Sequence, residues 1–397
     1  MQNSINRKSA IAGELERIED LIIDIRRHIH RFPELSHNEH GTAAYIAGIL
    51  EKEGIEVQKG IANTGLLVEL GSPTSSRKIA FRCDLDALPL IEETGAPYSS
   101  ENTGVMHACG HDVHTAIVSG TLLLLNKMKN QLKGNIKFIF QPAEEALSGG
   151  AELVVKEGVI DDVEAIFGIH VDPSLRMGTF GIKDEAMMAS VDFFDIVVKG
   201  KGGHGARPHD TIDTVFVAMQ AVNAIYQIQG RHFSSLENPT VISVCSFHGG
   251  TAHNIIPETC HFSGTFRTFA EEDRIKLRTL IERVTKEMCG MYGAECDIKI
   301  TPNAPPVIND PALGRLIEAT IRDVFGETSI EKLKYPMTAS EDFAYYREKC
   351  PIYFLRIGVC SAPENSHPLH NSKFNIDERA INRTVELMSH VLLRYFD

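Results

Sequence analysis

The sequence predicts an α/β protein in which a small second domain interrupts a larger one. Short apolar runs alternate with amphipathic segments through the first 180 residues, as in a sheet layered with helices. The pattern changes near residue 189 to strands of alternating polarity in the order β-α-β-β-α-β. Helical signals of the first kind return after residue 302. We therefore expect the small domain to be inserted into the large one.

Each element of the larger domain follows from its hydrophobic period. Apolar residues recur every three to four positions in the helices, whereas buried strands are short apolar runs bounded by turn residues. The predicted helices are 11–31, 41–54, 113–129, 149–158, 311–325 and 377–394. The predicted strands are 64–70, 78–84, 135–141, 165–171 and 352–359. Helices should cover both faces of the resulting sheet.

The smaller domain has the order of a split βαβ, or ferredoxin-like, unit. Its predicted elements are a strand at 189–200, a helix at 209–229, strands at 240–247 and 258–267, a helix at 271–290 and a strand at 294–301. A unit of about 110 residues is large enough to fold as a separate domain. We expect a catalytic part at 1–186, an inserted domain at 187–301 and a second catalytic part at 302–397.

Composition excludes several classes of function. Hydrophobic residues make up 43% and charged residues 23% of the chain, as in a globular protein with a substantial core. The net charge is −13 and the basic residues are scattered, which argues against a nucleic-acid partner. Apolar runs are shorter than the ~18 residues of a membrane helix. The N-terminus has charges throughout and does not read as a signal peptide, so we expect a cytoplasmic protein.

Eight cysteines are widely spaced and form no C-x-x-C pair. In a chain of this length without an export signal, the simplest reading is reduced thiols. Most of them lie in apolar stretches, where cysteine behaves as a small core residue. Cys109 differs, because glycine and histidines surround it.

Chemistry-bearing segments follow the predicted strands at their carboxyl ends, where open α/β sheets bind ligands. These segments are "FRCDLDALPL" (81–90), "FQPAEEALSGG" (140–150) and "GIHVDP" (168–173). A fourth segment, "HACGHDVH" (107–114), opens a helix. We expect these loops to converge on one site that is rich in acids and imidazoles.

The segment "HACGHDVH" has the composition of a metal site. Gly110 separates Cys109 from His111, and a bent backbone there can aim both side chains at one point. Thiolate and imidazole suit zinc and other late divalent metals. Asp112 would orient a metal ligand by a hydrogen bond without binding the metal itself. His114 lies one helical turn after His111 and is interpreted as a structural residue. A nucleophilic Cys–His pair is an alternative, but it would not explain the converging glutamates.

The segment "QPAEE" ends a strand with two adjacent carboxylates. Outside a helix the side chains of Glu144 and Glu145 diverge, so they can do different jobs. One can bind a metal while the other acts as general base toward water. The alternative is a solvated pair in a surface loop. Pro142 before the pair and the Ser-Gly-Gly at 148–150 after it indicate a tight, shaped loop instead.

Ten motifs together resemble the co-catalytic metallopeptidase and amidohydrolase family of aminoacylases, hippurate hydrolases, indole-acetyl-amino-acid hydrolases and N-acetyl-diaminopimelate deacetylases. They are "RRHIHRFPEL" (26–35), "FRCDLDALPL" (81–90), "MHACGHDVHTA" (106–116), "FQPAEE" (140–145), "GIHV" (168–171), "GKGGHGARPH" (200–209), "HNIIPE" (253–258), "SGTFRTF" (263–269), "MTASEDFAYY" (337–346) and "LHNSKFNIDE" (369–378). They run almost from end to end in the family's order. The resemblance implies a zinc-peptidase-like catalytic domain with a mixed sheet and an inserted ferredoxin-like lid.

The resemblance also implies a site with two divalent metal ions. The implied metal ligands are Cys109, His111, Glu145, His170 and His370, with Cys109 bridging both ions. Glu144 would be the general base, and Asp86 would orient a ligand. In the lid, His204 would stabilise the oxyanion, while Asn254 and Arg267 would bind the substrate carboxylate. Aminopeptidase-like relatives have His-x-Asp where this chain has Asp84-Leu85-Asp86, so one histidine ligand of those relatives is missing here. A site that mixes thiolate, imidazole and carboxylate could take zinc, manganese, cobalt or nickel.

The implied reaction is hydrolysis of an N-acyl-L-amino acid to a carboxylic acid and an amino acid by a metal-activated water. A dipeptidase or aminopeptidase is the nearest alternative, but a free α-amine would need an acidic partner, and the sequence indicates none. A metal-free binding protein would not need every ligand and the base. A zinc deaminase would need H-x-E with P-C-x-x-C, and this combination is missing. The acyl group, and whether the lid forms a homodimer or homotetramer that shares His204, stay open.

Overall fold

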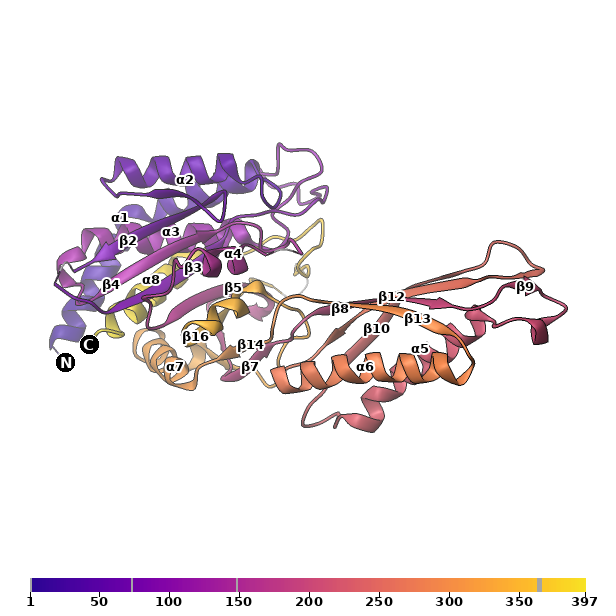
Figure 1. Ribbon diagram of the computed structural model, residues 1–397. Helices are drawn as coiled ribbons and strands as arrows, with labels where there is room; N and C mark the ends of the chain where they lie inside the picture. The colour runs from indigo at the N-terminus through magenta and orange to yellow at the C-terminus, as the bar shows by residue number, and fades with distance from the viewer. Residues whose placement is uncertain (1, 73, 148, 363–365) are drawn as a thin grey trace. The chain divides into compact units, whose positions relative to one another are not determined.

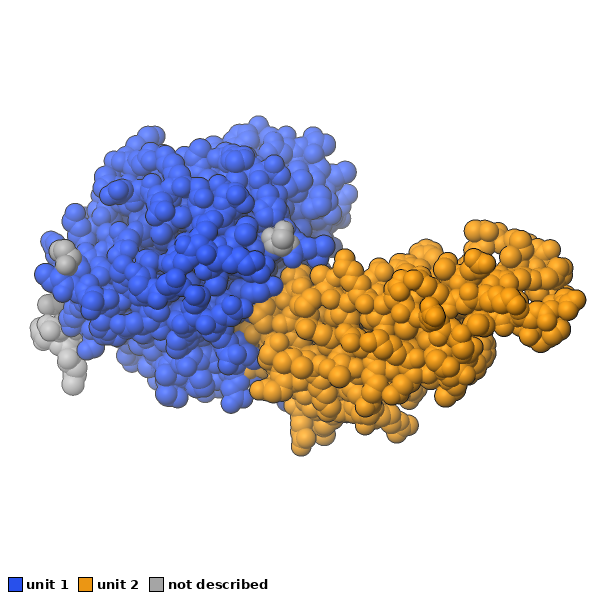
Figure 2. Space-filling view, viewed as in Figure 1, with its two compact units in different colours: residues 1–185, 308–334, 342–397 blue, residues 186–307, 335–341 orange. Residues whose placement is uncertain are grey.

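The computed structural model describes residues 2–72, 74–147, 149–362 and 366–397. The chain divides into two compact units (Figure 2). The larger consists of Met1–Glu185, Ile308–Lys334 and Asp342–Asp397, and the smaller of Ala186–Val307 and Tyr335–Glu341. Most of the smaller unit is thus a single insertion in the sequence of the larger one. The short segment Tyr335–Glu341 is a second insertion.

The larger unit is built on an eight-stranded mixed sheet in the order β1-β2-β4-β3-β5-β16-β6-β15 (Figure 1). Its strands are β1 (Gln58–Ile61), β2 (Gly65–Gly71), β3 (Lys78–Asp84), β4 (Asn135–Gln141), β5 (Ile166–Arg176), β6 (Phe180–Ile182), β15 (Ile330–Lys332) and β16 (Ile352–Cys360). The central strands β4, β3, β5 and β16 are parallel to their neighbours in this set. Every residue of β4 is buried, as expected for a strand covered on both faces.

The helices of this unit are α1 (Gln2–Arg31), α2 (His40–Lys52), α3 (His111–Lys127), α4 (Gly150–Lys156), α7 (Pro311–Phe325) and α8 (Arg379–Arg394). Helices α1, α3 and α8 pack against one another. The first fifteen residues of α3 are all buried, so this helix is enclosed on every side. Short 3₁₀ turns occupy Lys129–Gln131, Glu327–Ser329 and Asp342–Glu348.

The smaller unit has a four-stranded antiparallel sheet in the order β10-β12-β8-β13. Its main elements are β8 (Asp192–Lys199), α5 (Thr214–His232), β10 (Val241–Gly249), β12 (Thr259–Arg267), α6 (Glu271–Met291) and β13 (Glu295–Pro302). Two-residue strands β9 (Gly203–His204) and β11 (Ile255–Ile256) extend the β8–β12 ribbon beyond the sheet (Figure 1). The order along the chain is β-α-β-β-α-β, so both the predicted inserted unit and the predicted fold class are confirmed.

Most predicted elements lie within a few residues of their observed bounds, but two helices begin elsewhere. The helix expected from 11 begins at Gln2. The helix expected from 209 begins at Thr214, after a 3₁₀ turn at Pro208–Asp210. Asp213 caps it by accepting hydrogen bonds from the N–H groups of Val215 and Phe216, a strong start signal. The chain passes between the units at β7 (Glu185–Met188) and β14 (Val307–Asn309), and again before and after Tyr335–Glu341. A search of the described helices finds none with the length and apolar character to span a membrane.

Candidate metal centre

Parallel neighbours in the large sheet bring the chemistry-bearing loops to one edge. Asp84 at the end of β3 pairs with Gln141 at the end of β4, so the loops that follow them begin side by side. His170 does not end its strand as expected, because β5 continues to Arg176. It lies opposite Arg356 of β16 instead. The carboxyl-end edge of the sheet is therefore where the predicted site residues of the larger unit gather.

The turn before α3 aims Cys109 and His111 at this edge. Gly110 caps the helix with φ of 85°, a left-handed conformation that favours glycine. A Cβ atom there would lie 2.5 Å from Val171 Cγ2, so no larger residue fits. The backbone N–H of His370 donates to the carbonyl of Ala108 over 2.8 Å. This bond brings the C-terminal loop alongside the Cys-Gly-His turn.

The five predicted metal ligands meet in one cluster. Their ligand atoms, together with one of Glu144, form three overlapping groups, and within each group all atoms lie within 4.8 Å of one another. These groups are Cys109, His111 and His170; Cys109, Glu145 and His370; and His111, Glu144 and Glu145. Cys109 belongs to two of these groups. Its Sγ atom lies 3.4 Å from His170 Nε2.

Hydrogen bonds define the tautomers of the two buried imidazoles. Nδ1 of His111 lies 2.8 Å from the carbonyl oxygen of Asp86, and Nδ1 of His170 lies 2.8 Å from that of Val171. A carbonyl only accepts, so each Nδ1 carries a proton, and in the neutral ring each Nε2 presents a lone pair. His111 Nε2 is buried and has no hydrogen-bond partner among the described residues. Such an atom fits a metal ligand, since metal-binding histidines donate their other N–H in this way.

The charges of the cluster also fit a bound cation. Burial, and then the Glu145 carboxylate, raise the pKa of the Cys109 thiol. A thiolate at neutral pH therefore needs a neighbouring positive charge. Hydrogen bonds with Cys109 and Glu145 raise the pKa of His370 to about 10, which shows how strongly this group of side chains attracts positive charge. His370 Nε2 lies 3.2 Å from Glu145 Oε1.

The loop that carries Glu144 and Glu145, here called the glutamate loop, is held by hydrogen bonds from its backbone to Asp86. The carboxylate of Asp86 accepts the N–H of Glu144 at 3.1 Å and that of Glu145 at 3.0 Å. Its Oδ1 atom also lies 3.3 Å from His111 Nδ1. A Cβ atom on Gly150 would lie 1.8 Å from the carbonyl oxygen of Pro142, so the loop closes only with glycine there. Ser148, part of the predicted Ser-Gly-Gly turn, lies outside the described residues.

The side chain of Asp112, predicted to orient a metal ligand, has hydrogen bonds among the described residues only with α1. Its Oδ2 atom accepts a hydrogen bond from Arg26 Nε over 2.8 Å and lies 2.8 Å from His30 Nδ1. Successive residues of a helix point about 100° apart. Asp112 therefore faces α1 while its neighbour His111 faces the cluster. Its role in the structure is to tie the start of α3 to α1.

A buried polar network that was not predicted from the sequence adjoins the cluster. Arg82 Nη1 donates to Asp84 Oδ2 over 2.7 Å, and His114 Nδ1 lies 2.7 Å from Asp84 Oδ1. Burial opposes the charge on Asp84, but His111, His114 and Arg82 hold the pKa of its carboxyl well below its ordinary range. The signal was present as Arg-x-Asp in an apolar strand, because residues two apart on a strand share a face.

The three predicted lid residues lie in the smaller unit but not together. His204 pairs with Ile255 in the β9–β11 extension, and the carbonyl of Asn254 accepts the N–H of Gly205 over 2.8 Å. Both residues are exposed. Arg267 ends β12 at its other end. The nine residues of β12, at about 3.3 Å each, put Arg267 roughly 26 Å or more from His204.

Arg267 has the character of an anion-binding residue. It is half-buried, and its Nη1 atom has no hydrogen-bond partner among the residues that the structure describes. Burial lowers the pKa of its guanidinium, which is nonetheless charged at any physiological pH. A carboxylate would satisfy it in a two-pronged geometry.

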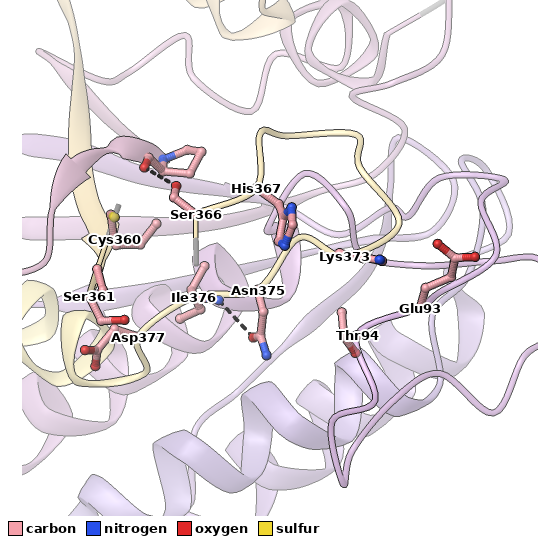
Figure 3. Close-up of a pocket in the computed structure, with 13 residues that line it drawn as sticks. Glu93, Thr94, Cys360, Ser361, Ser366, His367, Lys373, Asn375, Ile376 and Asp377 are labelled. Atoms are coloured by element: carbon pink, nitrogen blue, oxygen red, sulfur yellow. Dashed lines mark hydrogen bonds between the residues drawn. The ribbon is translucent and has the colours of Figure 1, made fainter. Parts of the chain in front are cut away.

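A polar cavity of about 320 Å³ lies in the larger unit beside the loop of His370 (Figure 3). Its described lining includes Thr94, Cys360, His367, Lys373 and Asn375, and none of the five predicted ligands. His367 and Lys373 flank His370 in the sequence. The loop that carries this candidate ligand therefore also lines an open, polar space.

Comparison with known proteins shows which family the chain belongs to. Residues 80–394 match the model of peptidase family M20/M25/M40. The chain belongs to this family. It is a hydrolase of the M20 group, with the eight-stranded mixed sheet and the inserted antiparallel unit of that fold.

Three relatives show the range of this M20 group. The N-acetylcysteine deacetylase of Bacillus subtilis (strain 168) is 41% identical, over 91% of this chain and 93% of its own. Thermostable carboxypeptidase 1 of Saccharolobus solfataricus is 37% identical, over 96% and 97%. The crystal structure of the Bacillus subtilis YXEP protein, described as a dinuclear metal-binding peptidase of the M20 family, superposes with a TM-score of 0.85 at 34% identity, covering 96% of this chain and 99% of that one.

Proposed function

We propose that this M20 protein is a metal-dependent amidohydrolase that cleaves N-acyl-L-amino acids. One observation carries the proposal. Glu144 Oε2 lies 3.9 Å from His111 Nε2, while the adjacent Glu145 lies within the cluster of five donors. A carboxylate thus stands beside the candidate ligands, where a general base toward water would be needed.

The donor set suits two divalent ions, which Cys109, His111, Glu145, His170 and His370 would hold. Mixed thiolate, imidazole and carboxylate ligands favour zinc or manganese, and they also accept cobalt or nickel. When bound, such ions activate water and polarise an amide carbonyl. The Nδ1–H hydrogen bonds of His111 and His170 would keep both rings oriented for this purpose.

Glu144 would move the proton. Its carboxylate takes a proton from the attacking water and then gives it to the nitrogen of the leaving amino acid. The backbone bonds of Asp86 to Glu144 and Glu145 keep the base and the ligand in fixed register. The products are a carboxylic acid and an amino acid.

The named relatives are consistent with one kind of scissile bond. A deacetylase of N-acetylcysteine and a carboxypeptidase both release an amino acid whose own carboxylate is free. Arg267 would bind that carboxylate, and Asn254 would assist it. A carboxypeptidase acting on peptides is therefore the second candidate, and it differs only in the acyl side of the substrate. An aminopeptidase fits less well, because a free α-amine on the substrate would need an acidic partner, and the sequence indicates none.

We further propose that residues 187–301 act as a lid and that 1–186 and 302–397 form the catalytic domain. His204 would stabilise the oxyanion of the tetrahedral intermediate. Because His204 and Arg267 lie at opposite ends of the smaller unit, one small substrate cannot contact both in a single chain. A homodimer or homotetramer assembled through the lid would supply His204 and Asn254 from a partner chain.

The test combines metal analysis with a substrate screen. Purified protein should hold close to two divalent ions per chain and should hydrolyse N-acetyl or N-benzoyl amino acids. Removing the ions with a chelator should stop hydrolysis, and zinc or manganese should restore it. A metal-loaded protein that cleaves only unblocked dipeptides would favour a dipeptidase instead.

A further inference from the structure

Asp84 and His114 form a buried unit beneath the candidate metal cluster. His114 Nδ1 lies 2.7 Å from Asp84 Oδ1, and His114 Nε2 accepts the backbone N–H of Val171 over 3.0 Å. All three residues are fully buried. Neither Asp84 nor His114 belongs to the proposed ligand set, so their connection to the site needs an explanation.

The donors and acceptors define one protonation state for this unit. A backbone N–H can only donate, so Nε2 of His114 carries the lone pair and Nδ1 carries the proton. That proton points to Asp84 Oδ1, while Arg82 Nη1 donates to Asp84 Oδ2 over 2.7 Å. Each oxygen of Asp84 therefore accepts from a defined donor. The carboxylate holds the His114 ring in a single orientation.

The unit reaches a proposed metal ligand through one residue. Val171, whose N–H is bound by His114, presents its carbonyl to Nδ1 of His170 over 2.8 Å. His170 Nε2 is the nitrogen that faces Cys109 Sγ. The order Asp84, His114, Val171 and His170 is thus a continuous series of hydrogen bonds joined by one residue of β5. A shift of Val171 would turn the His170 ring.

Asp84 is also close enough to the cluster to be considered a ligand itself. Its Oδ2 lies 3.8 Å from His111 Nε2, and Asp84, His111 and His114 form a compact group of potential donors. Both of its oxygens, however, already accept short hydrogen bonds from Arg82 and His114. A role behind the ligands fits this geometry better than direct coordination.

We propose that Asp84 and His114 are positioning residues that set the metal-binding orientation of His170 through the backbone of Val171. This inference rests on the proposed function, because it assumes that His170 binds a metal. It adds a supporting layer to the site, in which Asp84, the last residue of β3, stands two residues before Asp86. Supporting residues of this kind typically change metal affinity 10- to 100-fold.

The experiment compares five proteins: wild type, Asp84→Asn, His114→Phe, His114→Gln and the control Thr115→Val. Thr115 is equally buried and donates to the backbone carbonyl of Asp84 over 2.8 Å, so its loss disturbs the same place without touching the carboxylate. The readouts are the zinc dissociation constants from chelator competition and the visible absorption of the cobalt-loaded proteins.

His114→Phe should weaken one of two zinc ions by about 10- to 100-fold and alter the cobalt spectrum. His114→Gln retains an acceptor for the Val171 N–H and should show a smaller loss. It also serves if the phenylalanine variant does not fold. Thr115→Val should match the wild type in affinity and spectrum, although its stability falls.

Three results would separate the possibilities. Wild-type affinity and spectrum in both His114 variants would overturn the positioning role. Loss of one ion in Asp84→Asn, with both ions retained in the His114 variants, would make Asp84 a ligand and also overturn it. A wild-type protein that binds no zinc or cobalt would instead defeat the proposed function.

Discussion

Asp86 holds Glu144 through the backbone: Asp86 Oδ1 accepts the N–H of Glu144 over 3.1 Å. The same carboxylate accepts from Glu145 N–H and, over 2.6 Å, from Ser36 Oγ. Burial alone would raise the pKa of Asp86, but hydrogen bonds from His111 and Ser36 lower it. The backbones of Glu144 and Glu145 and the ring of His111 thus all contact the carboxylate of Asp86.

Asp86→Asn should disrupt these contacts. An amide has one accepting oxygen, so at least one buried N–H of the glutamate loop loses its partner, at a cost of about 1–3 kcal/mol. We expect kcat/KM to fall by about 100-fold, with a measurable loss of stability in urea. Ser36→Ala is the control, because it removes one donor from Asp86 and leaves the loop bonds in place. Equal losses in the two variants would contradict this role.

Glu144→Gln and Glu145→Gln should fail in different ways. Loss of a general base costs about 10²–10⁴-fold in turnover, so Glu144→Gln should keep its metal and lose kcat. Glu145→Gln removes a charged ligand and should lose metal first. Metal content and kcat measured on both proteins provide the check. Near-normal kcat in metal-loaded Glu144→Gln would refute the assignment of the base.

Arg267→Ala should impair only substrates with a free carboxylate. The unpartnered guanidinium nitrogen in the smaller unit would bind that group with a geometry that lysine does not reproduce. We expect a large loss of kcat/KM on an N-acyl amino acid, little change on the matching C-terminal amide, and poor rescue by Arg267→Lys. Similar losses on both substrates would indicate that Arg267 supports the fold of the lid.

Mixing two inactive proteins should test whether His204 acts across a dimer. His204→Ala has an intact Glu144, and Glu144→Gln has an intact His204, so a mixed dimer would contain one complete site. After co-expression in equal amounts, about a quarter of wild-type activity should return for a shared site in a symmetric dimer. Proven mixed dimers without activity would show that His204 works within its own chain, or not at all.

Stability should fall with acid because of His390. This side chain of α8 is buried, and both ring nitrogens have no hydrogen-bond partner within the described residues. Burial first, and then nearby basic residues including Arg394, lower the pKa of His390 to about 4. The unfolded chain takes up this proton near pH 6.5, whereas the folded chain resists it.

The stability that His390 provides is therefore complete above pH 6.5 and declines as the pH falls toward 4. The two pKa values differ by an amount worth roughly 3 kcal/mol. The measurement is the free energy of unfolding from pH 7.5 to pH 4 for wild type and His390→Leu. As the pH falls, the wild type should lose free energy of unfolding relative to His390→Leu. A difference between the two proteins that is independent of pH would contradict the prediction.

The predicted strand β4 at 135–141 matches the observed one, because its apolar run is bounded by clear turn residues at both ends. The start of α5 was less predictable. The apolar pattern alone did not indicate that Pro208–Asp210 forms a separate turn, although Asp213 carries the capping signal. Local composition thus predicts the type of an element more reliably than the residue at which the element begins.

The sequence by itself determined the fold class and the inserted unit, and its motifs indicated which residues to propose for the site, because hydrophobic period and motif order are properties of neighbours along the chain. Tertiary structure decided how those side chains point. Asp112 turns to Arg26 and His30 instead of the cluster, since its direction depends on what packs against α3. Asp84 and His114 support the site through Val171, a relation between three segments that no local pattern encodes. The separation of His204 from Arg267 likewise follows only from the register of β12 with its neighbours.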